Sequence, residues 1–423
     1  LQPTLGLEDS GELIVASDYL GVPHPPGYPI WTLLTWFFQW VFHGVTFHGH
    51  PNPAWAVNFF SAVSGAAACG VIALLISRSG MDLPRSLAKE SNRLGEKTES
   101  LFCSVAGISG GLLLAFGQGM WSQSVIAEVY SLNIFFQSLV LVFLYRWMSE
   151  PGNSKWLLLC AFLFGLGITN HQTLMFMGLA IAIAVLFNDL EIFQKKYLGF
   201  TLGALGALIV AFIGVYFGNL FLLFTGVIAC VVACLLIREH FLVRDFVITG
   251  SMYVLLFGFN KWAAASTDYQ HLTWVAGPDQ KGFWLWTIFA LLVPAIATFA
   301  LPRGKVVGPT FLVMFLGLAF YFYMPISSDQ NPPINWGYPR TWQGFMHAIT
   351  RGQYEQVKLA HVFSARFLQQ VGTYLTDLRS QFYGPVALLA AVPFFFCWKV
   401  GRRNIGWLLT TLIAFLSVGV VFM

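Results

Sequence analysis

The sequence has 423 residues, of which 57% are hydrophobic and only 10% are charged. Soluble globular domains carry about 25% charged residues, so this composition excludes an ordinary soluble enzyme and predicts an all-α polytopic membrane protein. The formal net charge of +4 has a membrane explanation, given below, and we expect no nucleic-acid partner.

The chain opens on an acidic cluster. Glu8, Asp9 and Glu12 fall within five positions of a chain that is otherwise almost uncharged. The segment 24–29, His-Pro-Pro-Gly-Tyr-Pro, follows and cannot lie inside a helix, because each proline lacks an N–H and restricts the residue before it. The sequence therefore predicts an acidic cluster that a rigid turn ties to the edge of a membrane-embedded body.

Apolar segments of about 20 residues are long enough to cross a bilayer. We predict twelve crossings, two of which are short helices within 156–187 that meet at a polar break, Thr169–Gln172. Because the chain starts at Leu1 and stops inside an apolar run, we also expect a first helix and a downstream region to be missing. The other ten predicted crossings are 54–77, 101–120, 130–148, 198–217, 219–237, 245–265, 283–301, 306–325, 384–398 and 405–423.

The apolar segment 30–47 is predicted to lie along the outer membrane surface. If it does not cross, every short basic loop falls on the cytoplasmic side, as the positive-inside rule requires. Trp31, Trp36, Trp40 and His43 suit a helix at the membrane interface. The cytoplasmic loops then hold 16 of the 23 basic residues, namely Arg78, Arg85, Lys89, Arg93, Lys97, Arg146, Lys155, Lys195, Lys196, Arg238, Arg244, Arg303, Lys305, Lys399, Arg402 and Arg403.

This assignment divides the chain into four parts. A first external loop (1–53) carries the acidic cluster, a transmembrane core (54–325) follows, and an external loop (326–383) precedes the C-terminal transmembrane helices (384–423). The polar groups outside the basic loops all fall on the extracytoplasmic side. Tryptophan and tyrosine are dense in 326–383, which argues against disorder and for a functional loop.

Five blocks in chain order resemble a known family. They are Asp9-Ser10-Gly11-Glu12-Leu13, the His24–Pro29 segment, Trp121–Asn133, Gly165–His171 and Asn331–Gly337. Together they are similar to a bacterial family of the GT-C class, formerly a domain of unknown function, that is related to protein O-mannosyltransferases. The matches run from residue 3 to about residue 354.

The resemblance implies a GT-C glycosyltransferase fold and O-mannosylation from a polyprenyl-phosphate sugar donor. It implies transfer with inversion to a hydroxyl acceptor at the periplasmic face of the bacterial inner membrane. A protein Ser or Thr is the expected acceptor, and a glycan or a lipid stays open. It also implies a carboxylate on the first external loop that acts as the catalytic base. One departure is that Ser327-Ser328-Asp329 stands where the family pattern has an arginine. The role of that arginine would pass to Arg340, Arg351 or Lys261.

Asp9 is the predicted catalytic base. A hydroxyl acceptor needs a base within hydrogen-bond reach, and one carboxylate suffices because a phosphate leaving group needs no protonation. Glu12 and Glu8 are the alternative bases. The structural alternative is that Asp9 caps a helix and Glu12 closes a capping box.

The remaining candidates are predicted to bind substrate. Glu128, at the outer end of a helix, either contacts substrate or bonds to the 170–172 break, because a carboxylate at membrane depth usually has a partner or a role. His24 and His171 lie in irregular segments that suit contacts to substrate or to neighbouring backbone. Arg340 and Arg351 are candidates for the donor phosphate, or else anchors at headgroup level.

No resident cofactor is expected, and a divalent metal held by the acidic cluster is not favoured. The cysteines lack zinc-ligand spacing. Predicted partners are membrane lipid, the lipid-linked donor, the acceptor and a larger membrane complex. Two other functions stay open: a non-catalytic structural subunit that has kept the fold, and a transporter, against which stands the absence of an inverted repeat of broken helices.

Overall fold

The computed structural model of the chain describes residues 3–6, 8–87, 94–189, 288, 290–295, 298, 303–354, 364–382 and 384–421. The chain divides into two compact units. The larger comprises Leu1–Ala184, Tyr269–Trp284 and Val313–Met423, and the smaller comprises Val185–Asp268 and Leu285–Leu312. Within the smaller unit, Arg303 pairs with Asp189; all other contacts discussed below lie within the larger unit.

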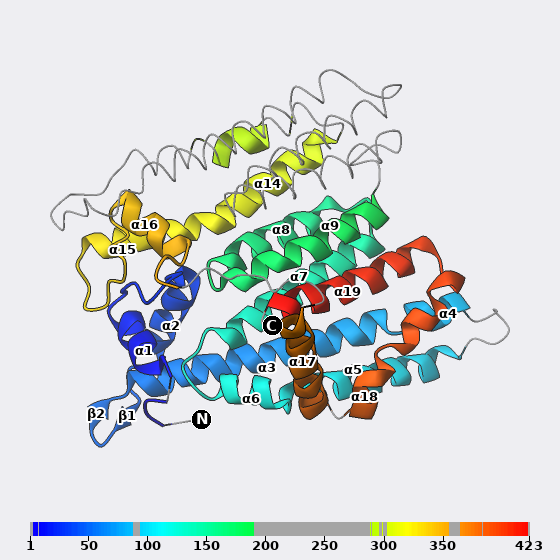
Figure 1. Ribbon diagram of the computed structural model, residues 1–423, viewed down its shortest axis with the longest axis horizontal. Coiled ribbons are helices and arrows are strands. Elements are labelled where there is room, and N and C mark those ends of the chain that lie inside the picture. Colours follow the sequence, from blue (N-terminus) through cyan, green and yellow to red (C-terminus); the bar gives the residue numbers. More distant parts are fainter. Residues whose placement is uncertain are drawn as a thin grey trace. The chain divides into compact units, whose positions relative to one another are not determined.

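The described part of the chain is almost entirely helical (Figure 1). A single short hairpin, β1 (Thr46–Phe47) with β2 (His50–Pro51), is the only sheet within the described ranges. The helices of the first half are α1 (Ser10–Asp18), α2 (Pro29–Val41), α3 (Pro53–Ser79), α4 (Asp82–Leu87), α5 (Glu96–Ala115), α6 (Gln118–Ser124), α7 (Tyr130–Ser149), α8 (Ser154–Ile168), η2 (Gln172–Phe176) and α9 (Met177–Asn188). Those of the second half are α14 (Gly304–Leu318), η6 (Ala319–Phe322), α15 (Tyr323–Asp329), α16 (Trp342–Ile349), α17 (Ala365–Phe382), α18 (Gly384–Leu389), η7 (Val392–Lys399) and α19 (Arg402–Val421).

Four helical segments in the described ranges are long and apolar enough to cross a bilayer: Pro53–Leu87, Glu96–Ala115, Tyr130–Ser149 and Gly304–Asp329. Two shorter apolar helices, Ser154–Ile168 and Gln172–Val185, accompany them. α3 lies against α5 and α7, and α7 lies against α8 (Figure 1). These segments support a polytopic membrane protein. The predicted crossings between 198 and 265 lie outside the described residues, as does most of 283–301.

Two predicted crossings have different helix boundaries in the structure. The segment 384–398 is not one helix, because α18 ends at Leu389 and the 3₁₀ helix η7 begins at Val392. Pro393, at the start of η7, cannot donate the backbone hydrogen bond that a continuing helix needs. The predicted crossing 101–120 begins earlier, at Glu96, and ends at Ala115, before the separate helix α6.

The segment 30–47 forms a helix too short to cross a membrane. α2 has 13 residues, which span about 20 Å at 1.5 Å per residue, against about 30 Å of hydrocarbon. Trp36 and Trp40 are exposed, as expected of interfacial residues, but Trp31 is fully buried. The interfacial role predicted for Trp31 is therefore wrong: its indole N–H donates to the backbone oxygen of Glu128 at 3.1 Å, so it packs inward.

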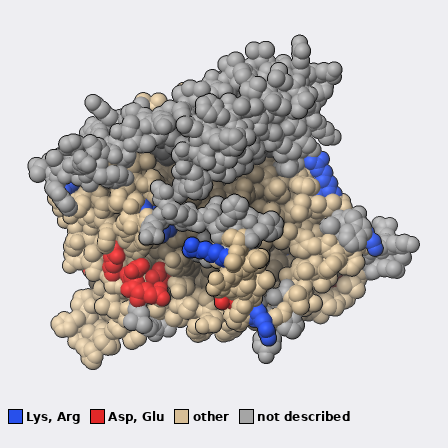
Figure 2. Space-filling model, in the orientation of Figure 1, with Lys and Arg blue, Asp and Glu red and all other residues tan. Residues whose placement is uncertain are grey.

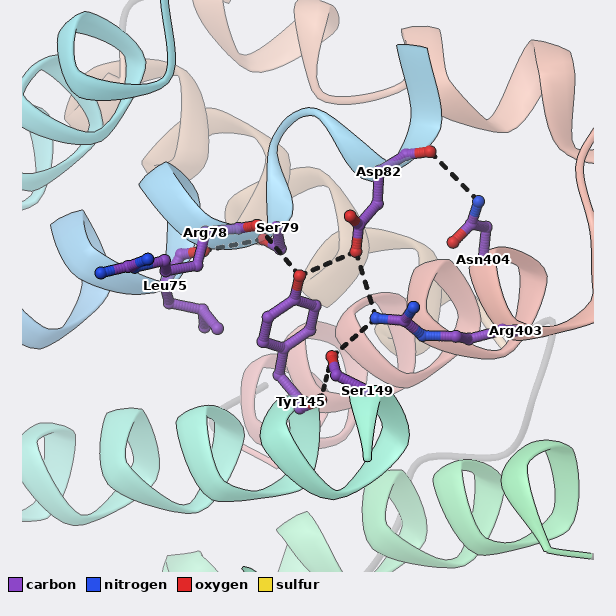
Figure 3. A network of polar contacts seen from close by, with 8 residues as sticks. All are labelled: Leu75, Arg78, Ser79, Asp82, Tyr145, Ser149, Arg403 and Asn404. Carbon is purple, nitrogen blue, oxygen red and sulfur yellow. Dashed lines mark hydrogen bonds and ion pairs between the residues drawn. The ribbon is translucent and has the colours of Figure 1, made fainter. Parts of the chain in front are cut away.

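Three of the predicted cytoplasmic loops meet at one end of the helices. Figure 3 shows this network: the Tyr145 hydroxyl donates to Asp82 Oδ2 at 2.7 Å, and Arg403 reaches Asp82 at 3.4 Å and the Ser149 hydroxyl at 2.6 Å. Asn404 donates to the Asp82 backbone oxygen at 3.2 Å. Side chains from α4, α7 and α19 thus tie together loops that are far apart in the sequence.

The polar groups predicted to face outward lie at the other end of α7. α7 begins at Tyr130 and ends at Ser149, so about 30 Å of helix, one hydrocarbon thickness, separates Glu128 from the network around Asp82. The two polar groupings therefore belong to opposite ends of α7, a helix long and apolar enough to cross a bilayer, which agrees with the separation that the charge distribution predicts.

The segment 320–354 packs against the first loop. A short parallel bridge joins Val22 to Asn335, with Val22 N–H donating to Ile334 O at 2.8 Å. The Tyr323 hydroxyl donates to Gly21 O at 2.9 Å, and the Ser327 hydroxyl donates to Leu20 O. Ser327 thus has a structural role at the place where the family resemblance leads us to expect an arginine. The predicted loop 326–383 also contains α16 and α17.

Candidate active site

The first turn of α1 presents two carboxylates in different environments. Asp9 occupies the N-cap position but makes no capping hydrogen bond, and 61% of its side chain is exposed. Glu12 is mostly covered and directs its carboxylate at His24, where one oxygen accepts the backbone N–H at 2.6 Å. The capping box considered for this pair is therefore wrong, because Glu12 is engaged by His24. Figure 2 shows acidic side chains gathered over this part of the surface.

His24 is buried and contacted on both ring nitrogens. Its Nδ1 lies 3.3 Å from Glu12 Oε2, and its Nε2 lies 2.9 Å from the Tyr28 hydroxyl. The same Nε2 is 3.8 Å from Asp9 Oδ2. Because a carboxylate only accepts, Nδ1 carries the proton, and in the neutral ring Nε2 accepts the Tyr28 O–H. His24 therefore links the covered Glu12 to the exposed Asp9.

Tyr28 joins this group to the break between α8 and η2. Its backbone is left-handed, with φ +42°, and follows Gly27 at φ +89°. Its ring is edge-on to His24 at 5.1 Å and parallel to the His171 ring at 6.1 Å, measured between centroids. Tyr130 covers another side of His171 at 5.3 Å. The two histidines predicted from separate motifs thus both contact one tyrosine, His24 at its edge and hydroxyl and His171 at its face.

His171 is held neutral. Its burial, followed by the positive charges of Arg351 and His24, lowers its pKa to about 4. Its Nδ1 accepts the Thr173 hydroxyl at 2.7 Å, and Thr173 in turn accepts an N–H from Asn133 at 3.0 Å. This chain of bonds leaves the proton on Nε2 of His171, where no hydrogen-bond partner is present among the described residues. His171 can therefore offer one neutral N–H donor.

Glu128 is buried just before α7, and its backbone is fixed from two sides. Trp31 and Ser61 donate to its backbone oxygen at 3.1 and 3.4 Å. Its carboxylate accepts the N–H of Val129 at 3.2 Å. The alternative that the carboxylate bonds to the 170–172 break is wrong, because Asn170 instead donates to the backbone oxygen of Val129 at 3.2 Å.

Burial raises the pKa of Glu128 to about 7, and the nearby negative charges of Glu8 and Asp9 add to this increase. The folded protein therefore binds more protons than the unfolded chain between the ordinary carboxyl value of 4.5 and about 7. Folding stability should fall as the pH rises through that window, by on the order of 2–3 kcal/mol. Below pH 4.5 the Glu128 carboxyl is protonated in both the folded and the unfolded protein, so it causes no change in folding stability there.

We predict that Glu128→Gln stabilises the protein at pH 8 by on the order of 2 kcal/mol, since the amide carries no charge that burial would penalise. At pH 4 the variant and the wild type should unfold alike. Denaturant unfolding in detergent at the two pH values measures the difference, with Asp377→Asn on the exposed side of α17 as control. Equal stabilities at pH 8 would show that the buried carboxylate is not destabilised.

The two candidate arginines have different surroundings. Arg340 donates to Asn331 Oδ1 at 2.7 Å and lies over the Tyr338 ring, so it is tied to its own loop. Arg351, which has a left-handed backbone with φ +56°, lies over the Tyr354 ring at 4.5 Å. Its charge acts on His171. The nearby Gln172 donates to Ile349 O at 2.5 Å and holds this loop at the break.

The structure thus connects most of the predicted site residues. Asp9, Glu12 and His24 are in contact, the charges of Asp9 and His24 act on Glu128, and His171 is joined to His24 through Tyr28. Arg340 is not among them. Nowhere in the described ranges do three or more His, Cys, Asp or Glu side chains gather closely enough to hold a metal ion.

Sequence reasoning missed Tyr28, Thr173 and Asn133 as members of this group. Tyr28 is within the conspicuous 24–29 segment, but its ring gave no signal that distinguished it from the other aromatic residues. Asn133 and Thr173 have a usable signal: polar side chains within or beside apolar helices commonly bond to each other across the helix interface.

Comparison with known proteins gives matches in the first half of the chain. Residues 9–194 match the family described as the protein O-mannosyl-transferase TMEM260 N-terminal domain. The mouse (Mus musculus) protein O-mannosyl-transferase TMEM260 is 31% identical over 186 residues, which are 43% of this chain and 23% of the relative. The Dictyostelium discoideum protein O-mannosyl-transferase tmem260 is 26% identical over 198 residues, 44% of this chain and 21% of the relative.

The matched region spans less than a quarter of either curated relative. No solved structure matches the chain. The region begins at Asp9 and contains Glu12, His24, Glu128 and His171, but it ends before Arg351. Over about 44% of its length the chain is therefore distantly homologous to protein O-mannosyl-transferase TMEM260, within that protein's N-terminal domain.

Proposed function

We propose that the protein is a membrane glycosyltransferase that moves mannose from a polyprenyl-phosphate donor to a hydroxyl group of a protein. The proposal places the reaction on the extracytoplasmic side of the membrane. The observation that carries it is the exposed carboxylate of Asp9, 3.8 Å from His24 at the start of the region shared with protein O-mannosyl-transferase TMEM260. An exposed base at the end of a transmembrane bundle can meet both a lipid-borne donor and a soluble acceptor.

In the proposed reaction, the acceptor oxygen forms a bond to C1 of the sugar while the bond from C1 to the phosphate oxygen breaks. Asp9 takes the proton of the attacking hydroxyl, and the polyprenyl phosphate leaves with the electron pair of the broken bond. Attack on the face opposite the phosphate inverts C1. A single base is enough, because the phosphate leaves without being protonated.

The leaving phosphate needs positive charge or N–H donors where its negative charge develops. Arg351 supplies a guanidinium whose charge acts on His171, and the N–H on Nε2 of His171 supplies a neutral donor. The uncharged state of His171 is useful here, since it can bond to the phosphate without forming an ion pair with Asp9 or Glu128. We assign the donor phosphate to these two residues and not to Arg340, whose guanidinium is tied to Asn331.

We predict that Arg351→Ala raises the KM for the polyprenyl-phosphate donor about ten- to a hundredfold, the range expected for the loss of hydrogen bonds to a charged group. The KM for the acceptor should change little. Initial rates at varied donor and varied acceptor concentrations separate the two constants. Arg379→Ala, on the exposed side of α17, is the control. An increase confined to the acceptor KM would place Arg351 in the acceptor site instead.

The proposal is tested by reconstituting the purified protein in liposomes with radiolabelled polyprenyl-phosphate mannose and a Ser/Thr-rich peptide. Transfer of label to the peptide is the expected result. Release of label into the lumen without transfer would favour a transporter. If neither occurs with any sugar donor, the protein is better explained as a structural subunit that has kept the fold.

A further inference from the structure

One ring nitrogen of His24 faces two competing partners. Nε2 lies 2.9 Å from the Tyr28 hydroxyl and 3.8 Å from Asp9 Oδ2. The first distance is a hydrogen bond, whereas the second is too long for one. The His24 ring cannot turn away, because the Glu12 carboxylate holds it at two points. One oxygen lies 3.3 Å from Nδ1 of His24, and the other accepts the backbone N–H of His24 at 2.6 Å.

The protonation state of His24 decides what Nε2 offers to Asp9. In the neutral ring, Nε2 carries a lone pair that accepts from Tyr28, and it has no attraction for a carboxylate. In the imidazolium, both ring nitrogens carry protons, so Nε2–H faces the Tyr28 hydroxyl and the Asp9 carboxylate as a donor. A charge-assisted bond to Asp9 then fixes its carboxylate and makes it a weaker base.

We propose that His24 is a positioning residue that decides whether Asp9 is available as the base. Neutral His24 bonds to Tyr28 and leaves Asp9 free to take a proton, whereas protonated His24 holds Asp9 in an ion pair. Glu12 is the anchor that aims the ring. This inference rests on the proposed function, because it assigns a role relative to the base of the transfer reaction.

Other charged groups surround this pair. Glu8 precedes Asp9 in the chain, and Glu128 lies before α7 within range of the charges of both Asp9 and His24. The His171 ring is stacked on Tyr28, and the charges of His24 and Arg351 act on it. Glu128 has its raised pKa near 7, so it can also titrate in the same range as a histidine. A test of His24 must therefore separate its effect from that of Glu128.

The kinetic test measures kcat against pH for the wild type, His24→Gln, Glu12→Gln and Glu128→Gln. Because glutamine cannot become a cation, His24→Gln should raise the ratio of kcat at pH 5.5 to kcat at pH 8 about tenfold, the effect expected when one charge-assisted hydrogen bond to Asp9 can no longer form. Glu12→Gln should raise the same ratio of kcat values, because it removes the carboxylate that stabilises protonated His24. It replaces His24→Gln in the test if that variant does not fold. A purely structural His24 would not give a variant that is relatively more active in acid.

Unchanged profiles in both His24→Gln and Glu12→Gln would overturn the inference, and so would a shift that appears only in Glu128→Gln. A second measurement does not depend on activity. In protein labelled with ¹⁵N-histidine, the His24 resonances, assigned by their loss in His24→Gln, should respond to Asp9→Asn when His24 is protonated and not when it is neutral. If Asp9→Asn leaves them unchanged at every pH, the inference fails even when transfer is observed.

Discussion

Asp9→Asn is expected to lower the rate of sugar transfer by about 10²–10⁴-fold, the usual contribution of a positioned general base. The fold should be unaffected, because 61% of the Asp9 side chain is exposed and it makes no capping hydrogen bond. The loss should appear in kcat, since asparagine has nearly the same shape and can still bond to the acceptor but cannot take its proton. Steady-state rates with labelled donor and peptide measure the effect.

Asp18→Asn is the matched control, because Asp18 is an exposed aspartate on the same helix, at its far end. It should retain wild-type kcat. If Asp9→Asn also retains it, Asp9 is not the base, and Glu12→Gln and Glu8→Gln become the variants to test. Equal thermal unfolding of both variants in detergent would exclude misfolding as the reason for any loss.

Gly165→Ala is expected to destabilise the protein by about 3 kcal/mol, at the upper end of the usual cost of overpacking. A Cβ at Gly165 would collide with the backbone oxygen of Met314. Gly317 on the opposite helix is also too close for a side chain, since a Cβ there would lie 2.5 Å from Leu166 N and 2.6 Å from Phe162 O. Two glycines thus let the backbones of α8 and α14 touch, as small residues do in membrane helix pairs.

Gly70→Ala is the control for this prediction. Gly70 lies in α3, and no atom comes within 4 Å of the position that a Cβ would take. Alanine favours a helix more than glycine does by about 1 kcal/mol, so this variant should unfold no more readily than the wild type. If denaturant unfolding in detergent gives the same stability for both variants, α8 and α14 are not in backbone contact.

The features that the sequence predicted well are those that depend on local pattern. The lengths of the apolar segments predicted the helices 54–77 and 130–148, and the polar residues 169–172 predicted the break between α8 and η2. The charge distribution separated the two polar ends of α7 and predicted that 30–47 does not cross, which agrees with the short helix α2. These properties follow from bilayer thickness and from the cost of burying charge, which act on each segment by itself.

The features that could not be predicted depend on contacts between distant segments. Whether Glu12 caps its own helix or binds His24 is decided by a turn twelve residues later, and Trp31 is buried because the backbone of Glu128 accepts its N–H. Arg340 and Arg351 have similar aromatic surroundings in the sequence. Only the folded chain shows that Arg340 is tied to Asn331, whereas the charge of Arg351 reaches His171.

The most direct test is an electron cryomicroscopy structure with a non-transferable polyprenyl-phosphate mannose analogue bound. The proposed mechanism predicts density for the phosphate beside Arg351 and His171, with C1 of the sugar turned toward Asp9 and the lipid tail leaving near residues 1–29. Density for the phosphate at the opposite end of α7, by Asp82 and Arg403, would contradict the assignment of Asp9 as the catalytic base.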